Sequence, residues 1–80
     1  MSADQILKQV NEIFKEILED DTISLTMETT IEDVDAWDSL NHIQLVVAVE
    51  RHFSIRCTSK EIQSWKNVGE LVDSIMQKTV

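Results

Sequence analysis

The sequence predicts an all-α fold with three main helices, one short helix and a long loop between the first two. The chain of 80 residues has no proline and one glycine, a composition that favours helices. Apolar residues recur at intervals of three and four in three segments, which is the spacing of one helical face. We expect one domain spanning residues 1–80, because this length leaves no room for a second.

The first helix should begin near Ser2, where Ser2 and Gln5 fit a capping box. Its apolar positions are Ile6, Leu7, Val10, Ile13, Phe14, Ile17 and Leu18. From residue 20 to 37 the helical period is absent, and the segment holds six acidic residues and no base. Loops beyond about 12–15 residues are uncommon in compact domains, so this one should carry a short turn or serve a function. Five residues could pin it to the core: Ile23, Leu25, Met27, Ile31 and Val34.

Asp38 can cap the second helix. The residues expected to face inward are Leu40, Ile43, Val46, Val47, Val49 and Phe53, with Leu45 and Ala48 widening the stripe. The run 45–49 could also form a strand, but the acidic cap and the flanking helical spacing favour a helix.

Two further capping patterns follow. Thr58 with Glu61 opens a short helix that carries Ile62 and Trp65. Asn67 with Glu70 opens the last helix, whose core positions are Val68, Leu71, Val72, Ile75 and Met76.

The net charge is −8, which repels nucleic acid and anionic membranes. The charge is uneven, because residues 1–38 contain eleven acids and two lysines while residues 39–80 contain four acids and five bases. A basic partner would be drawn to the first half. The lone Cys57 cannot form an internal disulfide, and no leader or long apolar run is present, so we expect a cytoplasmic protein with Cys57 as a small buried hydrophobe.

The segment Asp38-Ser39-Leu40 places a hydroxyl in the first turn of a helix. A phosphate on that oxygen would meet backbone amides, and the helix dipole favours an anion there by roughly 0.3–1 kcal/mol. The same three residues also form an ordinary helix cap. Taken alone, they leave both modification and capping open.

The wider stretch from Asp38 to Leu45, together with Val68-Gly69-Glu70-Leu71, resembles the acyl carrier and peptidyl carrier protein family. The resemblance implies a monomeric four-helix bundle whose Ser39 receives 4′-phosphopantetheine from a phosphopantetheinyl transferase. The arm's thiol would then hold an acyl or aminoacyl group as a thioester. Such a protein is a carrier and not an enzyme, and its other partners would be an acyl or aminoacyl ligase and downstream acyl-processing enzymes.

The resemblance also assigns roles in partner recognition. It implies that Asp38 helps the transferase to position its metal and substrate, and that the second helix is the docking face. The residues expected to take part in partner recognition are Trp37, Asp38, Leu40, Asn41, His42 and Ile43. In the family this face is usually acidic, whereas here Glu50 is the only acid between Asp38 and Glu61. This departure, and the Trp37 before Asp38, favour a dedicated partner set in specialised biosynthesis or lipid synthesis.

Both tryptophans have two interpretations. Trp37 could anchor an interface, but closing the loop over the core is the better fit to the usual burial of tryptophan. Trp65 should be in the core, and with Ile62 it lies where related carriers form a mouth between the second and third helices. There it could limit how much acyl chain enters.

Several alternatives compete with the carrier. Ser39 and His42 could form a nucleophile and base, but no Gly-x-Ser-x-Gly elbow accompanies them, and we interpret His42 as a solvent-facing contact residue. His42, His52 and Cys57 have no zinc spacing, and the acids of residues 20–38 lack the EF-hand order, so no metal is expected. The main alternative is an unmodified helical interaction module in which Ser39 only caps.

Overall fold

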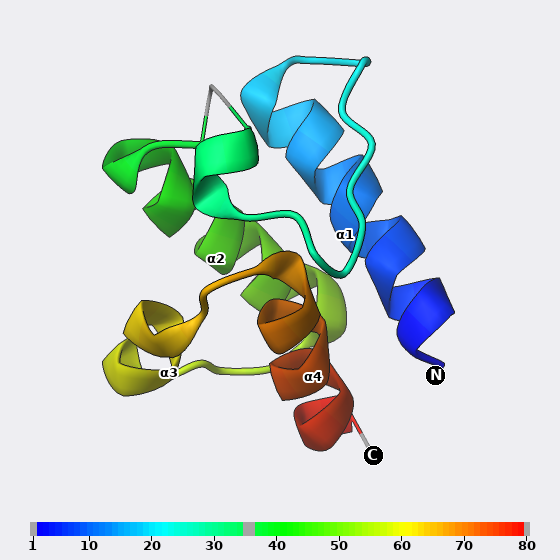
Figure 1. Cartoon of the computed structure of the whole chain (residues 1–80). Coiled ribbons are helices and arrows are strands. Elements are labelled where there is room, and N and C mark those ends of the chain that lie inside the picture. Colours follow the sequence, from blue (N-terminus) through cyan, green and yellow to red (C-terminus); the bar gives the residue numbers. More distant parts are fainter. Residues whose placement is uncertain (1, 35–36, 80) are drawn as a thin grey trace.

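The computed structural model describes residues 2–34 and 37–79, except for the side chains of Ile31 and Ser39. Four α-helices and one 3-10 helix follow in the order α1 (Ala3–Leu18), η1 (Ile31–Asp33), α2 (Ser39–Phe53), α3 (Ser59–Ser64) and α4 (Val68–Thr79). α1 packs against both α2 and α4 (Figure 1). The predicted all-α fold, with three main helices and a short one, is confirmed.

The helices begin where the capping residues predict. Ser2, Asp38, Thr58 and Asn67 each accept a hydrogen bond from the backbone amide three residues later, at 2.9–3.2 Å. The first amides of a helix have no acceptor within it, so these side chains supply one. α1 and α2 both end at a residue with a left-handed backbone, Glu19 (φ 52°) and Ser54 (φ 56°).

The long loop between α1 and α2 is fixed to the start of α4. The amides of Val68 and Gly69 donate to the carbonyls of Thr29 and Met27, both at 2.8 Å. The loop therefore satisfies backbone donors that α4 cannot satisfy itself. Figure 1 shows the loop crossing the bundle from the end of α1 to the start of α4 before it reaches η1.

The loop is also held by its apolar side chains, as predicted. Ile23 and Leu25 are buried, and Met27 and Val34 pack partly buried against the same core. The remaining predicted anchor, Ile31, lies outside the described side chains. The turn expected within the loop is the single turn of η1.

The orientation of α2 corrects the prediction for its apolar face. Leu40, Ile43 and Val47 were expected inside, but their exposed fractions are 68%, 63% and 42%. The buried residues of this helix include Leu45, Val46 and Val49. Apolar residues occupy most of the circumference of α2, so spacing alone could not decide which row would meet α1 and α4.

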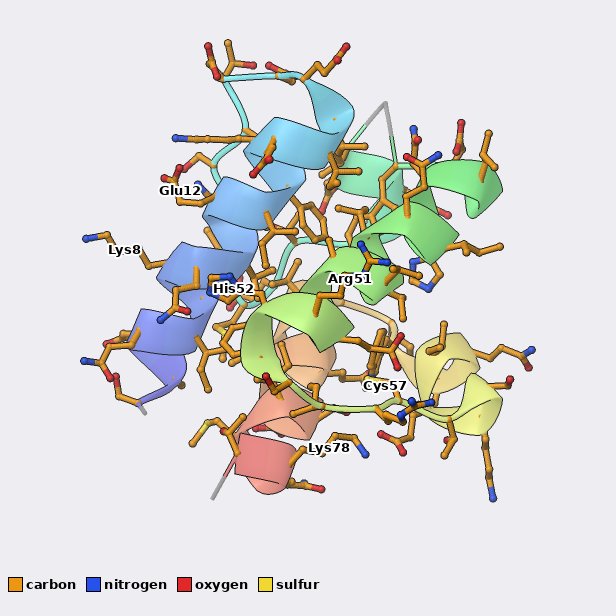
Figure 2. The ribbon with its side chains drawn as sticks, turned by 180° about the vertical axis from the view of Figure 1, so that it is seen from behind. Lys8, Glu12, Arg51, His52, Cys57 and Lys78 are labelled. Carbon is orange, nitrogen blue, oxygen red and sulfur yellow. The ribbon has the colours of Figure 1, made fainter. Side chains whose placement is uncertain are left out.

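α3 is joined to α4 by an ion pair between Glu61 and Lys78 at 3.1 Å. The hydrogen bond from the Lys78 ammonium lowers the pKa of the Glu61 carboxyl below its ordinary value. His52 of α2 lies 2.6 Å from the side-chain oxygen of Gln9 on α1. Figure 2, which views the bundle from behind, shows His52 on the side of α2 that lies next to α1.

Candidate functional site

The start of α2 is open to solvent on both sides of the predicted attachment residue. Ser39 is the first residue of the helix, and its side chain lies outside the described part of the structure. Asp38 before it is exposed, and its carboxylate accepts the Asn41 amide at 2.9 Å. Leu40 after it is 68% exposed. An enzyme could therefore approach this turn, and the positive end of the helix dipole lies here to favour a phosphate.

Trp37 closes the loop over the core, as the better of its two interpretations predicted. It is only 6% exposed, and its ring meets the ring of Phe14 from α1 edge-to-face at 4.8 Å. Its indole N–H donates to Nδ1 of His42 at 3.0 Å. Because the tryptophan precedes the cap of α2 by one residue, this packing fixes the entry of the chain into the helix.

His42 is not the solvent-facing residue that we predicted. It is half-buried, its ring stacks on Trp37 at 5.9 Å, and it meets Trp65 edge-to-face at 6.2 Å. Since Nδ1 accepts the indole proton, the neutral ring carries its own proton on Nε2. The spacing of Ser39 and His42 gave no sign of this role, because the two rings that His42 contacts, Trp37 and Trp65, lie outside α2.

Trp65 is 8% exposed and lies in the core, as predicted. Its indole N–H donates to the Ser74 hydroxyl of α4 at 2.9 Å. Ser74 was not among the residues predicted to be functional. Nothing in the sequence marks it, since Trp65 precedes α4 and Ser74 lies within that helix, nine residues later.

The outward face of α2 is apolar rather than acidic. Leu40, Ile43 and Val47 project from it, and a groove of about 410 Å³ runs beside Ile43 and Val47. The groove is lined by Ile17, Ile43, Gln44, Val47, Ala48 and Arg51. Grouped exposed apolar side chains are typical of protein interaction sites.

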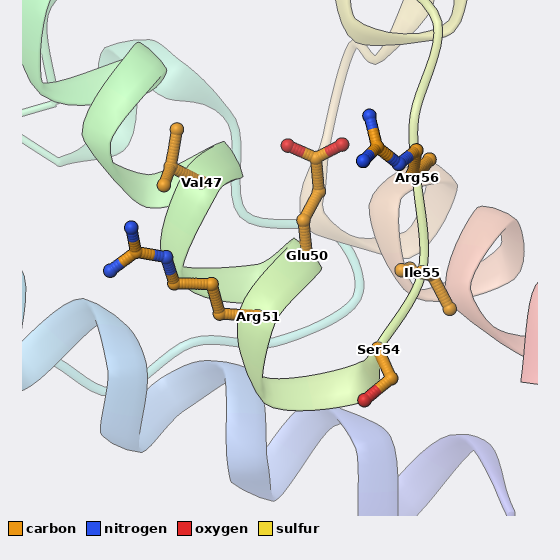
Figure 3. Close-up of a pocket in the computed structure, with 6 residues that line it drawn as sticks. All are labelled: Val47, Glu50, Arg51, Ser54, Ile55 and Arg56. Carbon is orange, nitrogen blue, oxygen red and sulfur yellow. The ribbon is translucent and has the colours of Figure 1, made fainter.

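The only acid of α2, Glu50, is used to hold the connector after the helix. Its carboxylate accepts the backbone amide of Cys57 at 2.9 Å. Glu50 also lines an open groove of about 450 Å³. Figure 3 shows its carboxylate with Arg51 and Arg56 on either side of it. The charged side chains that follow Glu50, Arg51 of α2 and Arg56 of the connector, are basic, so this end of the helix does not offer the acidic face that the resemblance to carrier proteins implies.

Cys57 is half-buried, which is less than predicted. Burial raises the pKa of its thiol, and the nearby carboxylates of Glu50 and Glu61 raise it further. A higher pKa lowers the fraction of reactive thiolate at neutral pH.

Among the described residues, 2–34 and 37–79, no three His, Cys, Asp or Glu side chains are grouped so that they could hold a metal ion. None of the helices in these ranges has the length and apolar character needed to cross a bilayer.

Comparison with known proteins decides the family. A family profile for the phosphopantetheine attachment site matches residues 8–75. The chain belongs to this family of carrier proteins. An acyl carrier protein of Acidothermus cellulolyticus is 34% identical over 80 residues, which span this whole chain and 95% of that protein. An acyl carrier protein of Streptococcus pyogenes serotype M1 is 35% identical over 74 residues, covering 92% of this chain and 96% of that one.

A solved structure agrees with the family assignment. The solution NMR structure of a holo acyl carrier protein from Geobacter metallireducens matches with a TM-score of 0.86 and 44% identity, over 91% of this chain and 84% of that one. As an acyl carrier protein, this chain is a carrier and a substrate of a phosphopantetheinyl transferase, not an enzyme. Its cofactor is covalently attached 4′-phosphopantetheine, and the open, dipole-favoured start of α2 fits that group.

Proposed function

We propose that the carrier holds its cargo on a 4′-phosphopantetheine arm esterified to Ser39. The observation that carries this is the position of Ser39 as the first residue of α2, between the exposed Asp38 and Leu40, inside the matched range 8–75. The arm's thiol would bind an acyl or aminoacyl group as a thioester. The whole chain, residues 1–80, would act as one monomeric carrier domain.

The modification itself is a phosphoryl-group transfer to serine. The Ser39 oxygen would attack the β-phosphorus of coenzyme A and form a phosphodiester. The bond between the two phosphates of coenzyme A breaks, adenosine 3′,5′-bisphosphate leaves, and the serine proton passes to a base of the transferase. By resemblance, Asp38 would help the transferase position its metal and substrate.

We propose the outward face of α2 as the docking surface for the ligase and the acyl-processing enzymes. Asp38, Leu40 and Ile43 are exposed and remain contact residues in this proposal. Asn41 is half-buried, and Trp37 and His42 pack inward, so we assign those three to positioning the start of α2.

The apolar character and the low negative charge of this outward face of α2 favour partners whose contact surface is apolar and near-neutral. Three exposed apolar side chains and Arg51 lie on it, while its one acid is bonded to the Cys57 amide. Charge complementarity selects partners and speeds their association. A partner with an apolar and near-neutral patch fits better than one with a strongly basic patch, which favours specialised biosynthesis or a branch of lipid synthesis. We propose the reducing cytoplasm as the compartment, because the arm ends in a free thiol.

The attachment site is tested by intact mass. Wild type, Ser39→Ala and Ser59→Ala would each be incubated with coenzyme A, magnesium and a broad-specificity phosphopantetheinyl transferase. Ser59 is a matched control, because it is also the first residue of a helix and follows a capping residue. We expect one arm on wild type and on Ser59→Ala, and none on Ser39→Ala.

The same experiment tests the unmodified interaction module. An arm on Ser39→Ala would show that another residue is the attachment site. No arm on any of the three, with a transferase that modifies a known carrier in parallel, would favour the module in which Ser39 only caps.

Asp38 can be tested for its two roles separately. Asp38→Asn keeps an oxygen that can cap α2 but removes the charge, and Asp38→Ala removes both. We expect both variants to slow the transfer of the arm. Only Asp38→Ala should lose stability, by about 0.5–2 kcal/mol in urea unfolding. Transfer to Asp38→Asn at the wild-type rate would show that the carboxylate charge has no part in recognition.

A further inference from the structure

The outward face of α2 leads to the only two arginines of the chain. One row along the helix is formed by side chains spaced three, four and four residues apart: Leu40, Ile43, Val47 and Arg51. All four of these side chains are exposed. Arg56, the second arginine, is exposed on the connector that follows the helix. The surface therefore changes from apolar to basic between the start of α2 and its end.

Neither guanidinium is neutralised within the described part of the chain. The ion pairs found there use Lys15 and Lys78 and neither arginine. Glu50 lies between the two arginines, as Figure 3 shows, but its carboxylate accepts the Cys57 amide at 2.9 Å and forms no ion pair with either described guanidinium. Two positive charges beside one negative charge leave this end of α2 net positive.

Unpaired arginines next to an exposed apolar surface have the chemistry of a protein contact site. Arginine is enriched among the residues that dominate binding energy at interfaces. Its planar guanidinium can donate two parallel hydrogen bonds to one carboxylate, which gives the pair both strength and direction. Val47 and Arg51 line both of the grooves beside α2, so one partner segment could make the apolar and the charged contact together.

The net charge of −8 limits how acidic such a partner can be. A strongly acidic protein would be repelled by the fifteen acidic residues of the chain. At physiological ionic strength the Debye length is about 8 Å, so charges far from a contact are largely screened, whereas pairs formed in the contact are not. One or two carboxylates at the edge of an apolar patch satisfy both conditions.

We propose that the enzymes that dock on α2 cover its apolar row and place one or two carboxylates against Arg51 and Arg56. The inference rests on the proposed docking face, and it adds the sign and the place of the partner's charge. That charge is opposite to the basic patch that an acidic α2 would need.

The position of the arginines also gives the partner an orientation. Arg51 follows Ser39 by twelve residues, which is about 18 Å along the helix at a rise of about 1.5 Å per residue. The partner's carboxylates would lie at the end of the docking surface that is far from Ser39. The entrance to its active site would then lie at the opposite end, where the arm leaves the carrier.

Synthetic peptides supply the partner surface in a defined form. Each peptide would be a helix with a row of four leucines, and the end of the row would carry two glutamates, two glutamines or two lysines. Binding to the ¹⁵N-labelled full-length carrier would be followed by NMR, through the amides of α2 and the side-chain Nε–H groups of Arg51 and Arg56. We expect the glutamate peptide to bind the outward face of α2 about tenfold more tightly than the lysine peptide, with the glutamine peptide between them.

Charge reversal in the carrier tests which side chain recognises the peptide. In Arg51→Glu we expect the preference for the glutamate peptide to be lost or reversed. Lys8→Glu is the matched control, because it changes the net charge equally, and Figure 2 shows Lys8 on the side of α1 away from α2. It should keep the preference. Arg51→Gln and Arg56→Gln are tested beside them in case the reversal disturbs the end of the helix, and each should weaken the preference by about threefold.

Three other results would overturn the inference. An equal affinity for the three peptides, or an unchanged preference in Arg51→Glu, would show that the arginines do not recognise the charge of a partner. Signals of Ile43 and Val47 that shift with the concentration of the carrier alone would show that a second copy covers the row. Absence of binding by all three peptides would show that the row is not a docking surface.

The outcome is separable from the attachment of the arm. The titrations would be repeated with the unmodified protein, so failure to load Ser39 in the mass experiment would overturn the carrier function without altering the peptide result. Binding on α2 with no preference for glutamate would overturn this inference alone and leave the proposed docking face intact.

Discussion

At the scale of single residues, the holo carrier, with its arm attached and no cargo on it, would have two thiols in different surroundings. The thiol of the arm would extend from the exposed start of α2, whereas Cys57 is half-buried next to Glu50 and Glu61. Burial and the two carboxylates raise the pKa of the Cys57 thiol. Cargo would therefore be attached to the arm without competition from the protein's own cysteine.

This difference can be measured by alkylation. With the holo protein at neutral pH, we expect iodoacetamide to modify the arm first and Cys57 several-fold more slowly, because the reaction needs the thiolate. Raising the pH should speed Cys57 more than the arm, since its raised pKa leaves more thiol to ionise. The denatured apo protein serves as control, and a Cys57 rate in the folded apo protein equal to the denatured rate would contradict the prediction.

At the scale of elements, the loop before α2 and the start of α4 depend on each other. The carbonyls of Met27 and Thr29 accept the first two amides of α4, and Thr30 pairs with Asn67 in an isolated antiparallel bridge. The close approach at Gly69 allows this contact. A Cβ added there would lie 2.8 Å from the Met27 carbonyl oxygen and 3.2 Å from Asn67 Oδ1.

Gly69→Ala is therefore expected to destabilise the fold. Alanine favours a helix interior over glycine by about 1 kcal/mol, but the added methyl group meets backbone that cannot rotate away. We expect a net loss of about 1–3 kcal/mol in urea unfolding, with an unchanged m-value. The exposed Gln77→Ala on the same helix should stay within about 0.5 kcal/mol of wild type. A Gly69→Ala variant as stable as wild type would show that the loop can shift freely.

At the scale of the whole molecule, fifteen acids and seven bases share a body of 31 × 24 × 21 Å. At about 0.01 M ionic strength the Debye length is about 30 Å, so charges repel one another across the whole protein. Eleven of the acids belong to residues 1–38. Folding therefore brings the carboxylates of residues 1–38 closer together, and their mutual repulsion should lower the stability of the folded state.

Salt should relieve this repulsion. We expect Tm to rise by about 3–8 °C between about 0.01 and 0.15 M NaCl, because screening removes a cost that the folded state bears more than the unfolded chain. A variant with both Glu28→Gln and Glu32→Gln, two exposed positions of the loop, should show a smaller rise. A fall in Tm on adding salt would mean that attractive pairs such as Glu61 and Lys78 outweigh the net repulsion.

The sequence by itself determined the features that arise from neighbouring residues. The start of each α-helix was predictable, because a capping side chain and the backbone amide that donates to it lie three residues apart. The place of Ser39 in a first turn followed from Asp38, and the anchoring of the loop followed from its apolar residues.

Only the tertiary structure decided which face of α2 is buried and what His42 does. A helix that is apolar on most of its circumference can present either row to the core, and the choice of Leu45, Val46 and Val49 over Leu40, Ile43 and Val47 depends on α1 and α4. The bonds from Trp37 to His42 and from Trp65 to Ser74 join side chains whose spacing follows no local rule. They form because packing brings the rings together, and burial then requires each indole N–H to find an acceptor.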